Sequence, residues 1–137
     1  MAITVPAAGT ELSVSTFGAP VANAINAATP TAWVGVPFIN AYGNQSGAYH
    51  PTQYRKIGDM VQVVGVVSGP ANAGSSFSFA FTLPAGFRPT AQIYAFMASW
   101  NNPTWQLGRA SILADGSVSL EFHQGQYIAL NFQFPTT

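Results

Sequence analysis

The chain has 137 residues and a formal charge of zero, because its four basic and four acidic side chains, 6% of the sequence, cancel. A chain of this length can build one hydrophobic core, and the absence of cysteine excludes disulfide bonds and thiolate metal sites. The few, scattered cations also argue against nucleic acid as a partner, because phosphate binding needs clustered Lys and Arg.

The small number of charged side chains favours association with other chains. Ordinary domains carry roughly a quarter of charged residues, whereas this sequence is 48% apolar and 6% charged. Little electrostatic repulsion would keep copies apart. We therefore expect a homo-oligomer or incorporation into a larger assembly. The alternative is a monomer kept soluble by Asn, Gln, Ser and Thr.

Residues 1–30 are predicted to form an N-terminal arm and one short helix that serve in assembly. Pro6 and Gly9 argue against a helix at the start. Further on, a short helix is predicted from an apolar stripe at helical spacing, which consists of Val21, Ala24, Ile25 and Ala28. This helix could pack on its own sheet or against copies of itself, and the sequence leaves both open.

Neither a secretory signal nor a membrane span is expected. The start of the chain lacks a basic region followed by a long apolar core. No apolar run approaches the ~20 residues that a membrane helix requires. We expect the protein to be made in a cytoplasm, to stay soluble there and to have no membrane partner.

The strongest strand signal lies in residues 53–67. Gly58-Asp59 is a tight-turn signal between a polar arm with Tyr54 and a valine-rich arm. The valine-rich arm carries apolar residues of both parities, so we expect both of its faces to be covered. A strand covered on both faces should be central in its sheet.

Further segments alternate apolar and polar residues or are rich in large apolar side chains, which is typical of strands. They are residues 31–38, 76–83, 91–100, 105–113, 117–122 and 128–134. Turn signals such as Asp115-Gly116, expected as a type I′ turn, separate them, and a long loop is expected at 39–52. About seven or eight short strands joined by hairpins predict a mostly β fold, an antiparallel β-sandwich over residues 31–137. A closed barrel is the alternative.

Two expectations concern side chains of these segments. Phe77, Phe79 and Phe81 should line one buried face, because they alternate with small or polar residues. Arg88 is placed to bind backbone carbonyls or Asp59, so its expected role is to hold the fold.

Three motifs occur in a fixed order along the chain, at residues 53–61 (QYRKIGDMV), 81–89 (FTLPAGFRP) and 115–118 (DGSV). Together they resemble a β-sandwich domain of tailed-bacteriophage structural proteins, whose pattern is roughly a YRK-x-GD-x-V hairpin, an LP-x-G-(F/Y)-RP turn and a DG-x-V hairpin. The resemblance covers about residues 31–135. It implies a virion protein, since such domains often sit at tail-fibre tips or in minor tail proteins, commonly as trimers, and some are receptor-binding heads.

The sequence departs from this family in one respect. Fibre tips usually follow a long shaft, whereas this chain begins about thirty residues before the domain. A decoration or baseplate accessory subunit, bound to other capsid or tail proteins, is therefore as well supported as a fibre tip. Residues 9–18 also look like segments of phage minor tail proteins.

The sequence offers no catalytic constellation, so no enzyme activity, cofactor or metal site is expected. Its four carboxylates are not spaced as an acid and base pair, and no serine lies in a Gly-x-Ser-x-Gly motif. His50 and His123 are isolated, whereas an ordinary metal site needs three or four donors. Three copies of one histidine on a trimer axis could supply them, but we do not expect this.

Two functions compete. The low charge and apolar composition fit a non-enzymatic structural protein of the virion surface that needs partners. The resemblance implies that it is a decoration or tail accessory subunit and that it is trimeric. The alternative is a tail-fibre head that binds a host-surface carbohydrate, because aromatic faces and amide groups hold sugars. The candidate ligand residues, which lie in loops or at strand ends, are Tyr42, Asn44, Gln45, Tyr49, Trp100, Asn101, Asn102 and Trp105. Packing in the core or between subunits is the competing role for the two tryptophans, and their large apolar area favours it.

Overall fold

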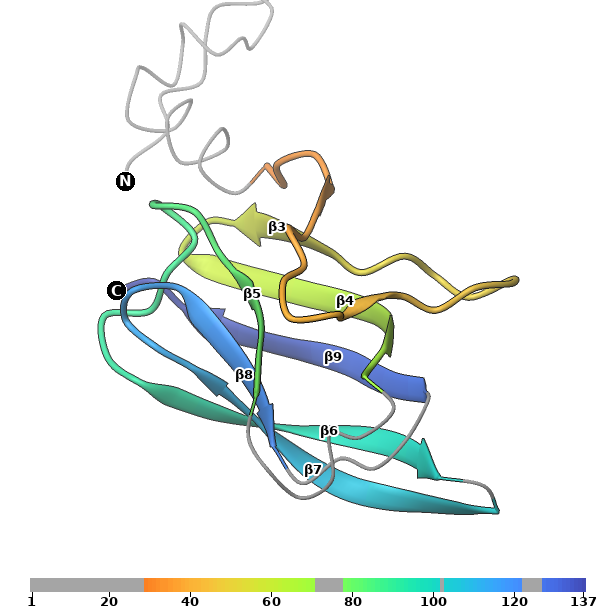
Figure 1. The fold of residues 1–137 in the computed structure, drawn as a ribbon. Helices are drawn as coiled ribbons and strands as arrows, with labels where there is room; N and C mark the ends of the chain where they lie inside the picture. The colour runs from red at the N-terminus through yellow and green to blue at the C-terminus, as the bar shows by residue number, and fades with distance from the viewer. Residues whose placement is uncertain (1–28, 71–77, 102, 122–126) are drawn as a thin grey trace, which may run out of the picture.

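The computed structural model describes residues 29–70, 78–101, 103–121 and 127–137. Nine β-strands make up its sheet (Figure 1): β1 Val34–Gly35, β2 Gly43–Asn44, β3 Gln53–Ile57, β4 Met60–Ser68, β5 Ser78–Thr82, β6 Ile93–Asn101, β7 Thr104–Ile112, β8 Ser117–Glu121 and β9 Tyr127–Pro135. The described ranges contain no helix, and hence none with the length and apolar character that crossing a bilayer requires. The residues predicted to form an assembly helix, Val21, Ala24, Ile25 and Ala28, lie outside the described residues.

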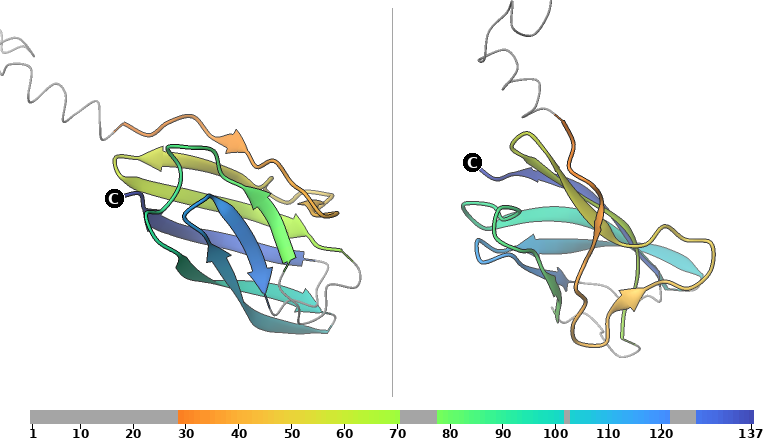
Figure 2. Two further views of the ribbon diagram at one scale, coloured as in Figure 1. Left: turned by 60° about the vertical axis from the view of Figure 1, so that its left-hand side comes forward. Right: turned by 90° about the horizontal axis from the view of Figure 1, so that it is seen from above.

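The strands form one antiparallel sheet in the order β1-β3-β4-β9-β6-β7-β8-β5, with β2 paired to β4 off this path. Strand β4 pairs with β3 and with β9, which confirms the predicted central position of the valine-rich strand. The sheet curls so that β5 and β8 face β4 and β9 across the core (Figures 1 and 2). A bridge between Phe38 and Phe81 joins the segment after β1 to β5. The predicted antiparallel β-sandwich is thus confirmed, in the form of a half-barrel made from a single sheet.

Alternate residues of the long strands build the core, because successive side chains of a strand point to opposite faces. In β4, Val61, Val63 and Val67 are fully buried. The register of β9 places Phe134 beside Val61 and Phe132 beside Val63. The facing part of the sheet contributes the buried side chains Phe81, Leu83, Ile112, Val118 and Leu120. Burial of one such side chain contributes roughly 1.5 to 3 kcal/mol, so this layer holds the two halves together.

The second face of β4 differs from the prediction. Met60, Val64 and Val66 are half-buried rather than buried. They lie on the outer side of the curled sheet, away from the core, so the apolar residues of this parity line an accessible surface instead of a second core.

Strand β5 also departs from strict alternation. Its register with β8 shifts between Phe79 and Phe81. As a result the consecutive residues Ala80 and Phe81 are both buried, while Phe79 is only half-buried. The expectation of one buried phenylalanine face therefore holds for Phe81 and is wrong for Phe79, and Phe77 lies outside the described residues.

The strands before β3 differ from the prediction in position and length. Of the strand predicted over residues 31–38, Val34–Gly35 pairs with β3, and Phe38 makes only its bridge. Within the predicted loop 39–52, Gly43–Asn44 pairs with the end of β4. Glycine and asparagine are poor strand formers, so this pairing is set by the neighbouring strand and not by local preference.

Two of the sequence motifs pack on each other at one end of the sheet. The backbone N–H of Leu83 donates to the carbonyl of Gly116 at 2.8 Å, and Nε of Arg88 donates to the carbonyl of Leu83 at 2.8 Å. The expected role of Arg88 in binding a carbonyl is confirmed. Its guanidinium satisfies the Leu83 oxygen, while the backbone bond from Leu83 to Gly116 joins the two turns.

The hairpin turn between β7 and β8 is not the predicted type I′ turn. Gly116 has a φ of 91°, as expected, but Asp115 is not among the non-glycine residues with positive φ. The N–H of Gly116 donates to Leu113, and the N–H of Leu113 donates to Ser117, both at 2.9 Å. This is the three-residue loop in which a type I turn precedes a left-handed glycine.

Candidate functional site

An open hollow of about 340 Å³ lies on the outer face of the sheet. Four aromatic side chains and two small aliphatic ones line it: Tyr49, Val66, Trp100, Trp105, Tyr127 and Ala129. In Figure 1 the tip of the β6–β7 hairpin, the start of β9 and the loop after β2 lie at the same end of the molecule. The hollow therefore brings together segments that are far apart in the sequence.

Sheet register places three of the aromatic rings side by side. Trp100 on β6 is the partner of Trp105 on β7 and also of Tyr127 on β9. Directly paired residues on neighbouring strands point to the same face, with their Cβ atoms about 4.5 to 5.5 Å apart. The rings of Trp100 and Trp105 are tilted at 55° with centroids 5.4 Å apart. They form one wall of the hollow.

The floor comes from the second face of β4. Val66 pairs with Ala129, which follows Tyr127 by two residues and so lies on the same face of β9. Because both side chains are short, they leave room between the larger rings. Val66, one of the half-buried apolar residues on the outer face of β4, thus lies at the base of an open hollow.

The fourth ring is delivered by the loop between β2 and β3. The N–H of Gln45 donates to the carbonyl of Val66 at 2.9 Å, and the N–H of Val66 donates to the carbonyl of His50 at 3.0 Å. Both ends of the loop are therefore tied to the same residue of β4. This tether brings Tyr49 over Tyr127, with ring centroids 5.4 Å apart and a tilt of 55°.

Gly65 allows the loop to pass so close to β4. It is buried with a φ of 139°, and a Cβ at this position would lie 2.4 Å from Cα of Thr52. No side chain fits that space. A larger residue would push residues 51 and 52 away and with them the loop that carries Tyr49.

The chemistry of the hollow is apolar and neutral. Trp105 is 61% exposed and Tyr49 is 48% exposed, while Trp100 and Tyr127 are half-buried. Among the described residues, no charged side chain lines this hollow. Exposed indole and phenol faces bind apolar C–H surfaces, and the hydroxyl and indole N–H groups offer hydrogen bonds. Such a surface suits a ligand with both C–H faces and hydroxyl groups.

The structure groups some of the predicted ligand residues and separates others. Tyr49, Trp100 and Trp105 line one hollow together. Tyr42 does not belong to it, because it is 6% exposed and packs in the core, where burial raises the pKa of its hydroxyl. Its selection as a ligand residue is wrong for that reason.

The predicted amide residues have other places. Oδ1 of Asn44 accepts a hydrogen bond from the N–H of Thr52 at 2.6 Å, so this side chain holds the loop closed. Gln45 binds β4 through its backbone. Asn102 lies outside the described residues, and Asn101 contributes the last backbone position of β6.

Sequence reasoning missed Tyr127, Val66 and Ala129. The signal for Val66 was present, because the valine-rich strand has apolar residues of both parities. Tyr127 begins the last strand, and its relation to Trp100 depends on which residues of β6 and β9 pair. Pairing between strands so distant in sequence cannot be found from local patterns.

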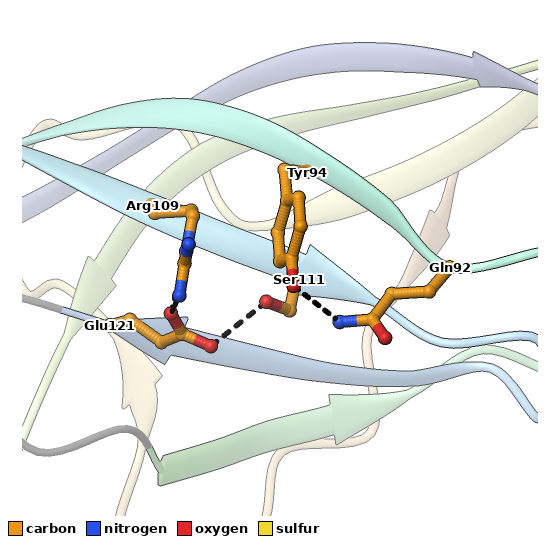
Figure 3. Close-up of polar contacts among 5 residues, drawn as sticks. All are labelled: Gln92, Tyr94, Arg109, Ser111 and Glu121. Carbon is orange, nitrogen blue, oxygen red and sulfur yellow. Dashed lines mark hydrogen bonds and ion pairs between the residues drawn. The ribbon is translucent and has the colours of Figure 1, made fainter.

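A separate polar cluster joins β6, β7 and β8 (Figure 3). Glu121 accepts hydrogen bonds on Oε2 from Nε of Arg109 at 2.7 Å and also from Nη2, and on Oε1 from Ser111 at 2.8 Å. The guanidinium carbon of Arg109 lies 4.4 Å from the ring centroid of Tyr94, whose hydroxyl accepts from Gln92 at 3.1 Å. Both carboxylate oxygens are engaged, so the cluster fixes β7 to β8 and does not present a free acid or base.

The described residues contain no set of side chains that could bind a metal ion. Groups of three or more His, Cys, Asp or Glu side chains that could hold an ion are absent from the described ranges. Nδ1 of His50 lies at hydrogen-bonding distance, 2.7 Å, from the carbonyl oxygen of Pro51. His123 lies outside the described residues.

The outer face of the β6–β7 hairpin is unusually apolar. Phe96 is 77% exposed and Leu107 is 71% exposed. Phe96 precedes Trp100 by four residues on β6, and Leu107 follows Trp105 by two residues on β7, so all four side chains lie on the same face of the hairpin. Large apolar side chains gathered on one exposed face are typical of surfaces that contact another molecule.

Two solved structures with a similar fold are those of phage receptor-binding proteins. The head domain of lactococcal phage bIL170, described as a receptor-binding domain, is 16% identical and has a TM-score of 0.60, with 76% of this chain and 96% of that chain covered. The receptor-binding protein (gp15) of Listeria phage PSA is also 16% identical, with a TM-score of 0.59 and 98% and 89% of the two chains covered. No family model matches the sequence, and no curated protein matches it. The chain has the fold of these phage head domains, which confirms the resemblance to phage tail structural domains at the level of fold.

Proposed function

We propose that this protein is a bacteriophage virion protein that binds a host-surface carbohydrate in the hollow formed by Tyr49, Trp100, Trp105 and Tyr127. The observation that carries the proposal is the convergence of these four rings, from one loop and three strands, on an open and uncharged surface. Their arrangement is what a sugar ring needs, since its C–H face packs on an aromatic ring while its hydroxyl groups bind polar atoms at the edge. The fold shared with two phage receptor-binding proteins supports the same function.

Of the two functions predicted from the sequence, the hollow favours the receptor-binding head over a decoration subunit. A subunit that only adds mass or strength to a particle has no need of an open aromatic hollow tethered by two backbone hydrogen bonds. The competing role for the tryptophans, packing within the core, does not fit Trp105, whose side chain is 61% exposed. A host-binding head is part of the tail, so we place the protein there, with other phage tail proteins as its neighbours.

We further propose that the protein works as a homotrimer. The low charge of the chain and the exposed Phe96 and Leu107 support self-association through the β6–β7 face. Three-fold symmetry follows the family that the sequence motifs resemble. The N-terminal residues 1–30 remain the predicted means of assembly or attachment to the particle. No catalytic role is proposed.

The test is binding of the full-length protein to an array of bacterial surface glycans, followed by titration of each bound glycan against variants. Trp105→Ala should weaken binding at least about tenfold, because truncation of a central aromatic contact commonly costs 2 kcal/mol or more. Phe96→Ala is the matched control, since it removes another exposed ring, on the neighbouring strand, that does not line the hollow.

Phe96→Ala should keep the affinity per site, because one chain supplies the whole hollow, and it should reduce the mass measured by light scattering. No binding to any glycan, together with no loss of adsorption to host cells by virions carrying Trp105→Ala, would overturn the proposal. Equal loss of affinity in both variants would show that the rings act through assembly and not as a ligand site.

A further inference from the structure

A second hollow, of about 440 Å³, lies on the same outer face of the sheet beside β1. Its lining differs from that of the aromatic hollow, because it includes one cation and three amide side chains: Trp33, Arg55, Gln62, Val64, Asn131, Phe132 and Gln133. Register explains the grouping. Gln62 on β4 is the partner of both Arg55 on β3 and Gln133 on β9. The guanidinium and two of the amides thus form one row across three strands.

The guanidinium of Arg55 is held in place on two sides. Nε donates to Oε1 of Gln62 at 2.8 Å, and the guanidinium carbon lies 4.3 Å from the ring centroid of Trp33. A stacked and hydrogen-bonded guanidinium has already lost most of its side-chain freedom, so a ligand that binds it loses less entropy. Both contacts leave the two terminal nitrogen atoms of the fork for another acceptor.

No acidic side chain of the described residues takes that position. The ion pair recorded in the described part of the chain joins Arg109 to Glu121 on other strands. A cation that is fixed by neutral neighbours and lines a hollow is an open site for an anion. Because Arg55 is the one cation among the described residues of the lining, the hollow suits a ligand group with a single negative charge.

We propose that the Arg55 hollow binds the carboxylate of an acidic sugar, with the planar fork of Arg55 facing the planar carboxylate and the amides of Asn131 and Gln133 receiving the hydroxyl groups of the same unit. A guanidinium pairs with a carboxylate through two parallel hydrogen bonds, whereas amides both donate to and accept from hydroxyl groups. The chemical class of the ligand is therefore a uronic-acid saccharide.

The two hollows are close enough to act on one chain of sugars. Val64 and Asn131 pair in the second hollow, and Val66 and Ala129 pair in the first, so the floors are two residues apart on β4. Two residues of a strand span roughly 6.5 to 7 Å. This distance is less than the length of two linked sugar units, so neighbouring units of one saccharide can reach both hollows. In this respect the inference rests on the proposed function, since it adds an acidic unit to the carbohydrate that the aromatic hollow receives.

The experiment measures dissociation constants of the full-length protein for trigalacturonate and for neutral galactotriose, by NMR titration that follows the side-chain N–H signals of Arg55 and Trp33. We expect a preference of about tenfold for the acid, the size of one charge-assisted hydrogen-bonded contact at a partly exposed site. Arg55→Gln should abolish the preference, and Arg55→Lys should lose most of it because the fork is gone.

Lys56→Gln is the matched control. It removes the same charge from the next residue, whose ammonium group instead binds the carbonyl of Gly86 at 3.0 Å. This variant should keep the preference. If Lys56→Gln lowers it as much as Arg55→Gln, the effect is one of net charge and the proposal is wrong. Tighter binding of galactose 6-phosphate than of galacturonate would overturn the assignment of a carboxylate.

The two proposals can fail separately. Loss of neutral binding in Trp105→Ala with an unchanged acid preference in Arg55→Gln would retain the aromatic site and overturn the Arg55 site. An acid preference that depends on Arg55, with neutral binding unaffected by Trp105→Ala, would do the reverse. Circular dichroism of each variant shows whether the sheet is intact, and Arg55→Lys provides a conservative replacement if Arg55→Gln does not fold.

Discussion

Trp100 and Trp105 are register partners at the open end of the β6–β7 hairpin, with ring centroids 5.4 Å apart. The pair is more than a packing contact, because Trp100 also has Tyr127 as its register partner on the other side and so stands in the middle of a row of rings. Trp105 forms the solvent-exposed end of that row. The two tryptophans therefore differ in what their removal should do.

Trp105→Ala should lower the free energy of unfolding by less than about 1 kcal/mol, since its side chain is mostly exposed. Trp100→Ala should cost more, roughly 2 to 3 kcal/mol, because the ring is half-buried between two neighbours. Urea denaturation followed by circular dichroism measures both. Equal costs would show that Trp105 is covered in the folded protein and is not part of an open hollow.

Gly116 and Gly86 provide a matched test of the packing between sequence motifs. Both have φ near +90°, but a Cβ at 116 would lie 2.3 Å from the carbonyl oxygen of Leu83, whereas a Cβ at 86 meets nothing within 4 Å. Gly86→Ala should therefore cost only the backbone strain of about 1 to 2 kcal/mol. Gly116→Ala should cost at least about 2 kcal/mol more, because it also separates Leu83 and Arg88 from the turn. The same denaturation experiment decides this, and equal costs would contradict the close approach of the two turns.

Phe81→Ala should destabilise the protein by about 3 to 5 kcal/mol, since this ring is fully buried against Phe38 and leaves a cavity when removed. Phe79→Ala should cost clearly less, because the register shift in β5 leaves Phe79 half-buried. A larger cost at Phe79 than at Phe81 would place the register shift elsewhere in the strand.

Glu121→Gln should lower stability by roughly 1 to 3 kcal/mol, because the carboxylate is largely buried and bound by Arg109 and Ser111. The 41% exposure of the Arg109 side chain places the effect toward the lower end of that range, through solvent screening. Asp59→Asn is the control, since Asp59 is an exposed carboxylate and its replacement should change stability by less than about 0.5 kcal/mol. Thermal unfolding of the two variants beside the parent gives the comparison.

Asp115 should titrate below its ordinary pKa of 3.8, chiefly because its carboxylate accepts a hydrogen bond from the N–H of Ser117 at 2.9 Å. A carboxyl group whose pKa is lower in the folded state stabilises the fold above the unfolded pKa. That contribution is lost as the pH falls through the folded pKa. NMR titration of the Asp115 carboxyl carbon measures the value, and a pKa above 3.8 would contradict the turn geometry.

Deletion of residues 1–28 should leave the sheet folded and weaken self-association or incorporation into virions. The described backbone hydrogen bonds of the sheet begin at Thr31, whose N–H donates to Lys56. Light scattering combined with circular dichroism of the truncated protein tests this. If the full-length protein is a monomer and the truncated protein is unfolded, residues 1–28 belong to the core and the assignment to assembly is wrong.

The sequence alone determined the kind of secondary structure and much of its extent. Alternation of apolar residues in β8 and β9, and the turn residues at Gly58 and Gly116, are local signals that depend on side chains a few residues apart. For the same reason the positions of the long strands β4, β6 and β7 agree with the prediction to within one or two residues. The positive φ of Gly116 was predictable, whereas the turn type depended on Asp115 and on the hydrogen bonds of Leu113.

The candidate site was decided by tertiary structure. Tyr42 and Tyr49 lie in the same predicted loop, each near glycine and asparagine residues. In the structure, however, Tyr42 is buried in the core and the ring of Tyr49 packs against that of Tyr127. The grouping of Trp100, Tyr127 and Val66 depends on the register of β6, β9 and β4, and a shift by one residue would turn every one of these side chains to the opposite face. Trp100 and Tyr127 are 27 residues apart in the sequence, and Val66 and Ala129 are 63 apart. Register over such separations is set by the packing of the whole core, so no local pattern in the sequence contains it.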